Sequence, residues 1–574
     1  MGALKSFVST RSPTRWQALW RAALLVLLAA WAGGCASLPS QRPRPASQAF
    51  DAPEQTALGR LAQGRRTQAR ARSDSGFRLL DSVEIAFTSR LALLEGAERS
   101  LDLQYYAIHA DASTELLLQG IRAAARRGVR VRILLDDFNT VGEDAQVLRL
   151  AFEPNVEIRL FNPLPGSRRS LATRVLGSLH DVPRIQKRMH NKLFIADNAW
   201  GITGGRNLGD AYFGGGERSN FVDLDVLAAG RVVRDMSASF DRFWNDPLAY
   251  PVQALLSAED LERLRKPQEP AAPSGSGPGA PAAAPVQAVA ASGGTVLPGM
   301  APAALAEAQR PALDLERVRL VWAPSVLLVD RPGKIAAGDD EGDAGETVVD
   351  GLLTLMAQAQ REVLIISPYF VPGSQMMASF AQLRARGVAV RVLTNSLASN
   401  DAPAAHAGYA RHRPALLQLG LELHEMRADP ETDSDMHGGS TVKGSRGSGL
   451  GGSLGSAAGG SKGGRSRASL HSKAVIIDRR LAIIGSMNLD LRSQLQNSEV
   501  ALVIRSGRLA EEAARLIENS FANGAYQVVQ DERGLLWRAP PGAAFADARS
   551  EPDAALRLRM LVRLLAPFAP DEML

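Results

Sequence analysis

One arrangement of polar residues and glycines occurs twice in this chain, and this repeat limits the possible folds more than any other feature. The first copy comprises His190, Lys192, Asp197, Gly204 and Asn207. The second copy comprises His471, Lys473, Asp478, Gly485 and Asn488. In both copies the lysine follows the histidine by 2 positions, the aspartate by 7, the glycine by 14 and the asparagine by 17, and the copies start 281 residues apart. These shared offsets predict an internal duplication with two halves of similar fold.

The residues before each copy predict the same order of helices and strands. In the first half, a helix over 83–96 and a strand over 101–108 precede a helix ending at Arg127-Gly128 and a strand over 129–135. The second half has a helix over 351–360, a strand over 363–370, a helix ending at Arg386-Gly387 and a strand over 388–393. Each glycine stands where a helix needs a left-handed cap. The alternation predicts α/β units whose sheets are covered by helices.

The spacing inside the repeat predicts which side chains act together. Residues two apart in a strand point to the same face, so each histidine is expected to project beside its lysine. Lysines are rarely buried without an anionic partner, so two matched pairs indicate a shared anion. The two aspartates have the opposite parity and are expected to support the turn that follows. Gly204 and Gly485 are expected to let a substrate phosphate approach the backbone closely.

No metal or cofactor is predicted. The six histidines outside the repeat show no ligand spacing such as His-Glu-x-x-His, and the chain has a single cysteine.

The N-terminus is predicted to be an export signal. Four basic residues precede an apolar run over 22–32, which is too short to span a bilayer of roughly 30 Å. The run Ala32-Gly-Gly-Cys35 resembles a bacterial lipobox, whose cysteine is lipidated; an ordinary signal peptide or short anchor with an incidental cysteine is the alternative. Removal of the four charges from the formal +6 leaves +2, which disfavours a nucleic-acid partner.

Composition divides the rest of the chain. We predict a signal peptide over 1–34, a polar tether over 35–75, a first domain over 76–265, a Pro/Ala/Gly-rich linker over 266–311 and a second domain over 312–540. A Gly/Ser-rich insertion over 429–467 is either functionless or a lid beside the second histidine. The tail over 541–574 alternates arginine with leucine, so it is either a basic amphipathic helix on anionic lipid or a packing helix.

Both copies resemble the HKD motif of the phospholipase D superfamily, and the resemblance covers nearly the whole mature chain. Within the superfamily the chain is most similar to cardiolipin synthases of the C type. The runs that carry this second likeness are 134–139, 204–214, 220–225, 394–401 and 406–411. The resemblance implies an α/β fold with two pseudo-symmetric α/β/α sandwich domains packed around one shared active site.

The resemblance also implies roles for the repeated residues. The expected catalytic set is His190, Lys192, Asp197, His471, Lys473 and Asp478. His190 is expected to attack phosphorus, giving a phosphohistidine, while His471 acts as acid and base. Residues expected to bind phosphate or support the site are Gly204, Gly205, Asn207, Gly485, Ser486, Asn488, Asp223 and Glu499. Gly205 stands where the second half has Ser486, so one hydroxyl donor is missing.

The implied activity is transfer of a phosphatidyl group from one phospholipid to phosphatidylglycerol, giving cardiolipin. Phosphatidylethanolamine is an alternative donor. The alternative reaction is hydrolysis by a phospholipase D, phosphodiesterase or nuclease, and a different class altogether is a non-catalytic lipoprotein. The expected partners are phospholipids and a membrane surface; nucleic acid is not expected, and no protein partner is indicated. The lipobox implies attachment to a membrane of the bacterial cell envelope on its periplasmic side, and Ala36 favours the outer membrane.

Overall fold

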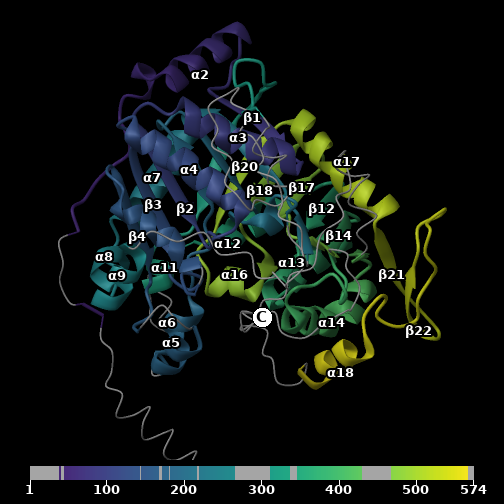
Figure 1. Ribbon diagram of the computed structural model, residues 1–574. Coiled ribbons are helices and arrows are strands. Elements are labelled where there is room, and N and C mark those ends of the chain that lie inside the picture. The colour runs from purple at the N-terminus through teal and green to yellow at the C-terminus, as the bar shows by residue number, and fades with distance from the viewer. Residues whose placement is uncertain are drawn as a thin grey trace, which may run out of the picture.

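The fold is built on two large mixed sheets, one from each half of the chain. The structure is a computed structural model, and it describes residues 38–39, 44–142, 144–166, 171–179, 181–215, 219–265, 311–336, 346–428 and 467–565. Within these residues each sheet has nine strands. Figure 1 shows the first half, in purple to teal, beside the second half, in green to yellow. The predicted duplication is therefore visible in the architecture.

The first sheet has the strand order β10-β1-β8-β6-β5-β2-β3-β4-β9. Strands β2, β3 and β4 are parallel, and β5 returns antiparallel beside β2. The strand bounds are β1 (Ser75–Leu80), β2 (Ser100–Tyr105), β3 (Arg130–Asp136), β4 (Val156–Phe161), β5 (Leu193–Ala196), β6 (Trp200–Gly204), β8 (Asp225–Gly230), β9 (Ala249–Pro251) and β10 (Val321–Trp322).

The second sheet has the order β11-β20-β18-β17-β12-β14-β15-β21-β22, with β12, β14 and β15 parallel and β17 returning beside β12. The strand bounds are β11 (Ser325–Val329), β12 (Glu362–Ile366), β14 (Ala389–Asn395), β15 (Glu422–Met426), β17 (Ala474–Ile477), β18 (Leu481–Gly485), β20 (Val500–Arg505), β21 (Ala525–Asp531) and β22 (Gly534–Arg538). The six strands from β8 to β4 in the first sheet thus correspond to the six from β20 to β15 in the second.

Helices and two small sheets complete the described chain. The first half has α2 (Ala57–Gln68), α3 (Val83–Gly96), α4 (Ala112–Arg126), α5 (Leu171–Gly177), α6 (Val182–Gln186), α7 (Arg231–Trp244), α8 (Val252–Leu255) and α9 (Ala258–Arg265), with the 3₁₀ helices η1 (Pro53–Gln55), η2 (Asp144–Phe152) and η3 (Asp210–Tyr212). The second half has α11 (Gly333–Ala336), α12 (Val348–Met356), α13 (Ser374–Ala385), α14 (Pro403–Gln418), α16 (Leu491–Leu495), α17 (Gly507–Asn523) and α18 (Leu556–Leu565). The small sheets pair β13 (Phe370–Val371) with β19 (Leu489–Asp490), and β7 (Ser219–Val222) with β16 (Arg467–Leu470).

The two sheets share one hydrophobic core. Residues from one face of each sheet, together with the apolar sides of α7 and α17, form a single cluster that includes Phe77, Leu134, Ile366 and Ile484. The opposite face of each sheet has its own cluster, which is covered by α3 and α4 in the first half and by α12 and α13 in the second. The halves are therefore joined by apolar burial as well as by the site.

Most of the predicted elements are present, and their ends have local causes. Gly128 and Gly387 have φ of +92° and +78°, as the predicted caps require. The predicted strand over 363–370 stops at Ile366, because Pro368 has no backbone N–H to donate to a neighbouring strand. The prediction that the motif histidines and lysines lie within strands is wrong: β5 begins at Leu193 and β17 at Ala474, one residue after each lysine.

Two segments lie elsewhere than their predicted domain indicated. Residues 312–322, which we assigned to the second domain, lie on the first half, where Leu315 and Val318 join its core and β10 pairs with β1. Part of the predicted tether forms α2, and Leu58 and Ala62 of this helix are buried. The signal peptide with Cys35, most of the linker and nearly all of the Gly/Ser-rich insertion lie outside the described residues. In the described part of the chain, no helix combines the length and apolar character needed to cross a bilayer.

The shared core has a consequence for unfolding. Because the same apolar cluster is built from both sheets, loss of one half exposes the core face of the other. We expect calorimetry and far-ultraviolet circular dichroism to record one cooperative transition at one midpoint. Two transitions separated by several degrees would show instead that the halves unfold independently.

Candidate active site

Each motif histidine lies just before a strand, at the edge of its sheet where the parallel strands end. The backbone N–H of Met189 donates to Asp136, the last residue of β3, at 2.9 Å. In the second half Leu470 N–H donates to Asn395, the last residue of β14, also at 2.9 Å. A polar side chain at the end of a parallel strand thus fixes the residue before each histidine. Asp136 is in a run that pointed to the family, but sequence reasoning gave it no role.

The two halves exchange backbone contacts at these histidines. His190 N–H donates to the carbonyl of Ser498, in the second half, at 2.9 Å. His471 N–H donates to the carbonyl of Val222, in the first half, also at 2.9 Å. The pairing of β7 with β16 extends the second contact. Each histidine is therefore positioned by the main chain of the opposite half.

The carboxylates follow the same exchange. Glu499 of the second half contacts His190 Nδ1 with both oxygens at 3.0 Å, and Asp223 of the first half contacts His471 Nδ1 at 2.7 Å. All four side chains are buried or nearly so. A carboxylate on Nδ1 holds the proton there, so Nε2 of each ring is left as the basic atom. Sequence analysis named both acids but did not foresee that they serve the opposite half.

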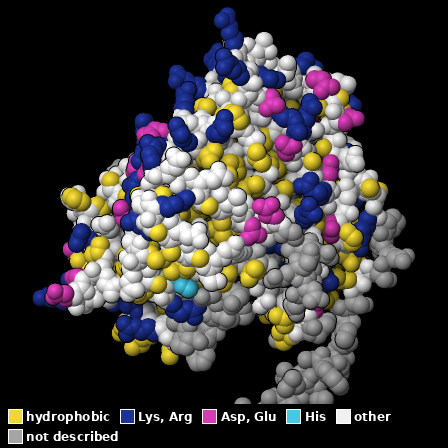
Figure 2. Space-filling view, turned by 180° about the vertical axis from the view of Figure 1, so that it is seen from behind, with side chains coloured by type: hydrophobic (Ala, Val, Ile, Leu, Met, Phe, Trp, Pro, Cys, Tyr) yellow, Lys and Arg dark blue, Asp and Glu magenta, His cyan; other side chains and the backbone are white. Residues whose placement is uncertain are grey.

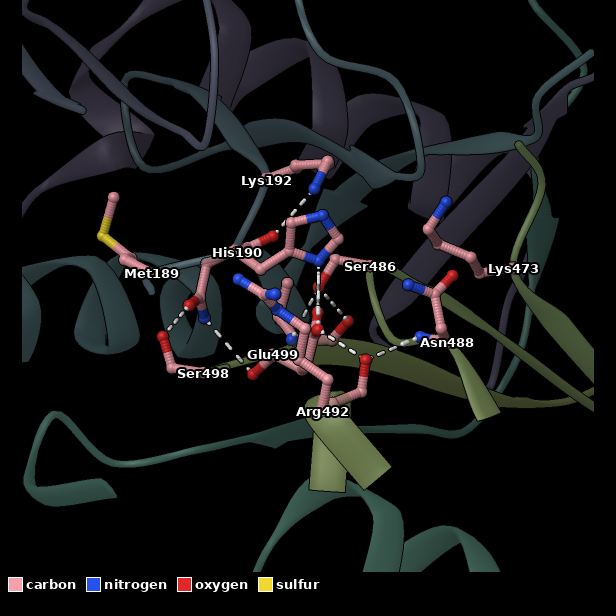
Figure 3. A network of polar contacts seen from close by, with 12 residues as sticks. Met189, His190, Lys192, Lys473, Ser486, Asn488, Arg492, Ser498 and Glu499 are labelled. Atoms are coloured by element: carbon pink, nitrogen blue, oxygen red, sulfur yellow. Dashed lines mark hydrogen bonds and ion pairs between the residues drawn. The ribbon is translucent and has the colours of Figure 1, made fainter. Parts of the chain in front are cut away.

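Glu499 is held more firmly than Asp223. Ser486 donates a hydrogen bond to one Glu499 oxygen (Figure 3). Ser493 donates to the other oxygen at 3.0 Å. Asp223 accepts the backbone N–H of Leu224 at 2.8 Å. A Cβ added at Gly205 would overlap Asp223, so this glycine makes room for the carboxylate. The first half therefore lacks a counterpart of the Ser486 hydroxyl because the Asp223 carboxylate occupies the space beside Gly205.

Both lysines are buried close to the histidines. Lys192 Nζ donates to the carbonyl of His190 at 2.9 Å, and Lys473 Nζ lies 3.1 Å from His471 Nδ1. In Figure 3 the Lys192 ammonium lies beside the His190 ring, while Lys473 comes from the second half. Burial lowers the pKa of Lys192 to about 7 and also lowers the pKa of Lys473, although Glu499 and Asp223 oppose this effect. A bound anion would offset the unfavourable free energy of burying these two ammonium groups.

The histidines are strongly desolvated. Burial, with help from both lysines, lowers the pKa of His190 to about 4, although Glu499 opposes the shift. Burial also lowers the pKa of His471 well below its ordinary value, and Lys473, Lys192 and His190 add to this. Both lysines therefore act electrostatically on both imidazoles and lower the pKa of each. Burial raises the pKa of Asp223. Burial also acts to raise the pKa of Glu499, but His190, Lys192 and Ser486 together lower it.

Aromatic rings line both histidines. Tyr106 lies edge-on to His190 with ring centroids 5.2 Å apart, and Tyr212 has the same arrangement with His471 at 5.3 Å. Asn207 donates to the Tyr212 hydroxyl at 2.9 Å. In the second half, the backbone N–H of Asn488 donates to Ser493 at 3.1 Å, and the Asn488 side-chain oxygen is buried without a hydrogen-bond partner in the structure.

Two site residues were missed although the sequence held a signal for them. Tyr212 and Ser493 both lie 22 positions after their histidine, so they form a fifth shared offset. Their side chains differ, and for that reason a search for identical residues passes over them. Each contacts the asparagine of its own repeat.

The motif aspartates lie away from the imidazoles. Asp197 accepts three backbone N–H groups, those of residues 98–100, and Asp478 accepts those of residues 360–362. Each aspartate and the residue after it has φ of +52°, which forms the turn between two strands. These contacts agree with the parity argument and differ from the catalytic role that the resemblance implied.

The glycines Gly204 and Gly485 have a role other than the one predicted from sequence. A Cβ at Gly204 would overlap the backbone of the neighbouring strand near Leu224 and Asp225, and a Cβ at Gly485 would overlap the Val500 carbonyl. The absent side chains allow strands to approach each other. The prediction that they open the backbone to a phosphate is not supported by this geometry.

The comparisons with known proteins agree with this architecture. A family model described as "Cardiolipin synthase, PLD-like domain" matches residues 91–244, 352–444 and 450–522. Cardiolipin synthase C of Escherichia coli (strain K12) is 36% identical over 494 residues, which cover 85% of this chain and 94% of that protein. The chain belongs to this family of the phospholipase D superfamily.

Other relatives extend over similar lengths of this phospholipase D-like chain. An uncharacterised protein of Helicobacter pylori (strain J99) is 27% identical over 548 residues, covering 94% of this chain and 97% of that protein. The crystal structure of phosphatidylserine synthase from Haemophilus influenzae Rd KW20 matches with a TM-score of 0.53 at 14% identity, covering 89% of this chain and 99% of that one. This last likeness concerns the fold alone. The predicted family and the two phospholipase D-like halves are confirmed.

In this phospholipase D-like site, Gly205 offers a direct test of how Asp223 is seated. We expect Gly205→Ser, which makes the first half resemble the second, to displace the Asp223 carboxylate and lower kcat about 100-fold through misplacement of His471. Steady-state kinetics on phospholipid vesicles provide the measurement. Gly64→Ser is the matched control, because a Cβ at Gly64 meets nothing within 4 Å. An unchanged kcat in Gly205→Ser would mean that the carboxylate position is not needed.

The lowered pKa of Lys192 predicts a pH dependence. Lysine loses its charge as pH rises through its pKa, so a value of about 7 means that kcat/KM falls on the alkaline side from near neutrality. We expect Lys192→Arg, which keeps its charge, to move this alkaline limb upward by more than one pH unit. An alkaline limb at the same pH in both proteins would assign it to another group.

Proposed function

We propose that this chain is a phosphatidyltransferase that makes cardiolipin from phosphatidylglycerol and a second phospholipid through a phosphohistidine. The observation that carries the proposal is the exchanged pairing of Glu499 with His190 and of Asp223 with His471, which gathers two imidazoles and two lysines in one site. The likeness to Cardiolipin synthase C supports the lipid substrate. Phosphatidylglycerol is the acceptor, and either phosphatidylglycerol or phosphatidylethanolamine serves as donor.

In the first step His190 Nε2 forms a bond to phosphorus, and the bond from phosphorus to the headgroup oxygen breaks. His471 gives its proton to the departing alkoxide. Without substrate, His471 has a lowered pKa and is neutral. The anionic phosphate of the bound donor raises this pKa, so His471 is protonated when the headgroup leaves. His190 suits the nucleophilic role because its carboxylate, Glu499, has a lowered pKa and is held by Ser486 and Ser493. An ionised partner stabilises the positive ring that forms on phosphorylation.

In the second step the hydroxyl of the acceptor gives its proton to His471 while its oxygen attacks phosphorus. The bond from phosphorus to His190 then breaks, and cardiolipin leaves with both histidines restored. Lys192, Lys473, Asn207 and Asn488 are proposed to neutralise the equatorial oxygens, each donor contributing about 3 kcal/mol to transition-state stabilisation. Asp197 and Asp478 are proposed to support the strands that hold these groups.

The segments outside the described residues belong to the same proposal. Residues 1–34 are proposed to form a signal peptide. Cys35 is proposed to be lipidated and to attach the protein to the periplasmic side of an envelope membrane. Ala36 favours the outer membrane. The domains are proposed to extend over 76–265 and from about residue 324 to 540, followed by the tail over 541–574. The likeness to a cardiolipin synthase supports membrane association.

The test is lipid mass spectrometry on the purified chain supplied with phosphatidylglycerol vesicles. We expect cardiolipin and glycerol from the wild type, and a loss of at least about 1,000-fold in His190→Ala and in His471→Ala, because each removes a reacting group. A phosphatidyl group trapped on the protein after a denaturing quench at neutral pH, where the phosphorus–nitrogen bond survives, is expected in His471→Ala and not in His190→Ala.

A fold control and a rival substrate complete this experiment. Circular dichroism should be unchanged in both variants. Plasmid DNA is given to the same preparations: DNA cleavage without cardiolipin formation would replace the proposal with a nuclease. Phosphatidic acid as the sole product would replace it with a hydrolase.

A further inference from the structure

The exposed large hydrophobic side chains of the described residues gather at one end of the molecule. Seven such side chains are exposed, and six of them belong to three segments: Leu179 and Val182 at α5 and α6, Leu495 on α16, and Leu556, Met560 and Leu564 on α18. The seventh, Val326, lies on the edge strand β11. Figure 1 shows α5, α6, α16 and α18 in the lower part of the molecule, and Figure 2 shows hydrophobic and basic side chains together along the lower edge.

The chain topology places these segments at the edge of the sheets that holds the candidate site. Helices α5 and α6 lie between the end of β4 and His190. Helix α16 follows Asn488, and Arg492 on α16 reaches the Gln186 carbonyl of α6 at 3.5 Å. Helix α18 packs against Leu397 and Ala398, directly after β14 ends. Both halves therefore contribute to a discontinuous rim at the edge of the sheets that holds the site.

Helix α18 is fixed in this position. Its inner side chains Leu558 and Val562 join a cluster with the loop after β14. Before the helix, Glu551 accepts a hydrogen bond from the buried Arg413 at 2.9 Å. Leu556, Met560 and Leu564 are spaced by four, so they form one stripe on the outer side, and they are 64%, 55% and 70% exposed. The outer stripe therefore lies opposite the side of α18 that packs against the second half.

The positive charge beside this stripe favours an anionic partner. Arg557 and Arg563 are exposed on the same helix, and α18 has no acidic residue. Arginine beside an apolar stripe is the composition of helices that lie in the interface of anionic bilayers. The proposed substrates are phospholipids, and phosphatidylglycerol is anionic, so a site that faced away from the bilayer would have to extract its substrate into water.

We propose that α5–α6, α16 and α18 form a bilayer-docking rim that seats the mouth of the site on an anionic lipid surface. The inference rests on the proposed function for its choice of lipid. The partner is the lipid surface itself, and the rim is a contact additional to any lipid at Cys35. Leu556, Met560 and Leu564 enter the interface, while Arg557 and Arg563 contact headgroup phosphates.

The first test compares two forms of one substrate using the full chain. Cardiolipin formation is measured on vesicles of phosphatidylglycerol and phosphatidylcholine, and on short-chain phosphatidylglycerol dispersed as monomers. We expect the triple variant Leu556→Gln, Met560→Gln, Leu564→Gln to raise the half-saturating vesicle concentration at least about tenfold. Its kcat/KM on monomeric substrate should stay unchanged. The pair Leu179→Gln, Val182→Gln should act in the same direction.

Val326→Gln is the matched control, because Val326 is 59% exposed but lies outside the rim. It should leave both activities unchanged. Equal vesicle affinity for the triple variant and the wild type would overturn the docking rim, as would an equal loss in Val326→Gln. If the triple variant instead changes sedimentation of the protein without vesicles and leaves vesicle activity intact, the stripe contacts protein and the proposal fails.

A second measurement does not depend on catalysis. An environment-sensitive fluorophore is attached to Met560→Cys and, separately, to Val326→Cys, and the labelled wild type reports the background from Cys35. Spin-labelled lipids in the vesicles should quench the probe at 560 and leave the probe at 326 unquenched. No quenching at 560 would overturn the rim. Quenching together with a lack of cardiolipin from either substrate would keep the rim and reject the proposed function.

Discussion

The exchange of carboxylates between the halves is the interaction on which the rest of the structure depends. A buried imidazole needs a partner for Nδ1, and a buried carboxylate needs donors for its oxygens, since either group alone would be costly to desolvate. Glu499 and Asp223 meet these needs across the interface, at 3.0 Å and 2.7 Å. The neighbouring backbone contacts and the core common to both sheets hold the two sets of groups in register. Neither half contains a complete site.

The sequence predicted the family and the two α/β/α halves because identical residues recur at the same offsets in both halves. It placed helix boundaries well where a glycine cap marked them, as at Gly128 and Gly387. It failed at strand ends, where the length of a strand depends on its neighbour. Pairing between β5 and β2 ends at Leu193, opposite Gln104, and for this reason Lys192 and His190 lie outside the ladder.

The sequence named candidate residues for the site but did not predict how they pair. Offsets along one chain reveal which residues are alike, but they carry no information about contacts 309 positions apart, such as Glu499 with His190. The glycines were misread for a related reason. A missing side chain can accommodate a ligand or another strand, and only the packing around Gly204 and Gly485 shows that strands occupy the space.

The fusion of both halves in one polypeptide gives the duplicated centre a freedom that two identical subunits lack. A symmetric pair of subunits would have to seat both acids in the same way. Here one acid is clasped by two serine hydroxyls, while the other fits into the space above a glycine. The two imidazoles can therefore differ in basicity although they descend from one pattern. Covalent linkage of the halves thus allows the two histidines to take different roles within a pseudo-twofold symmetric structure.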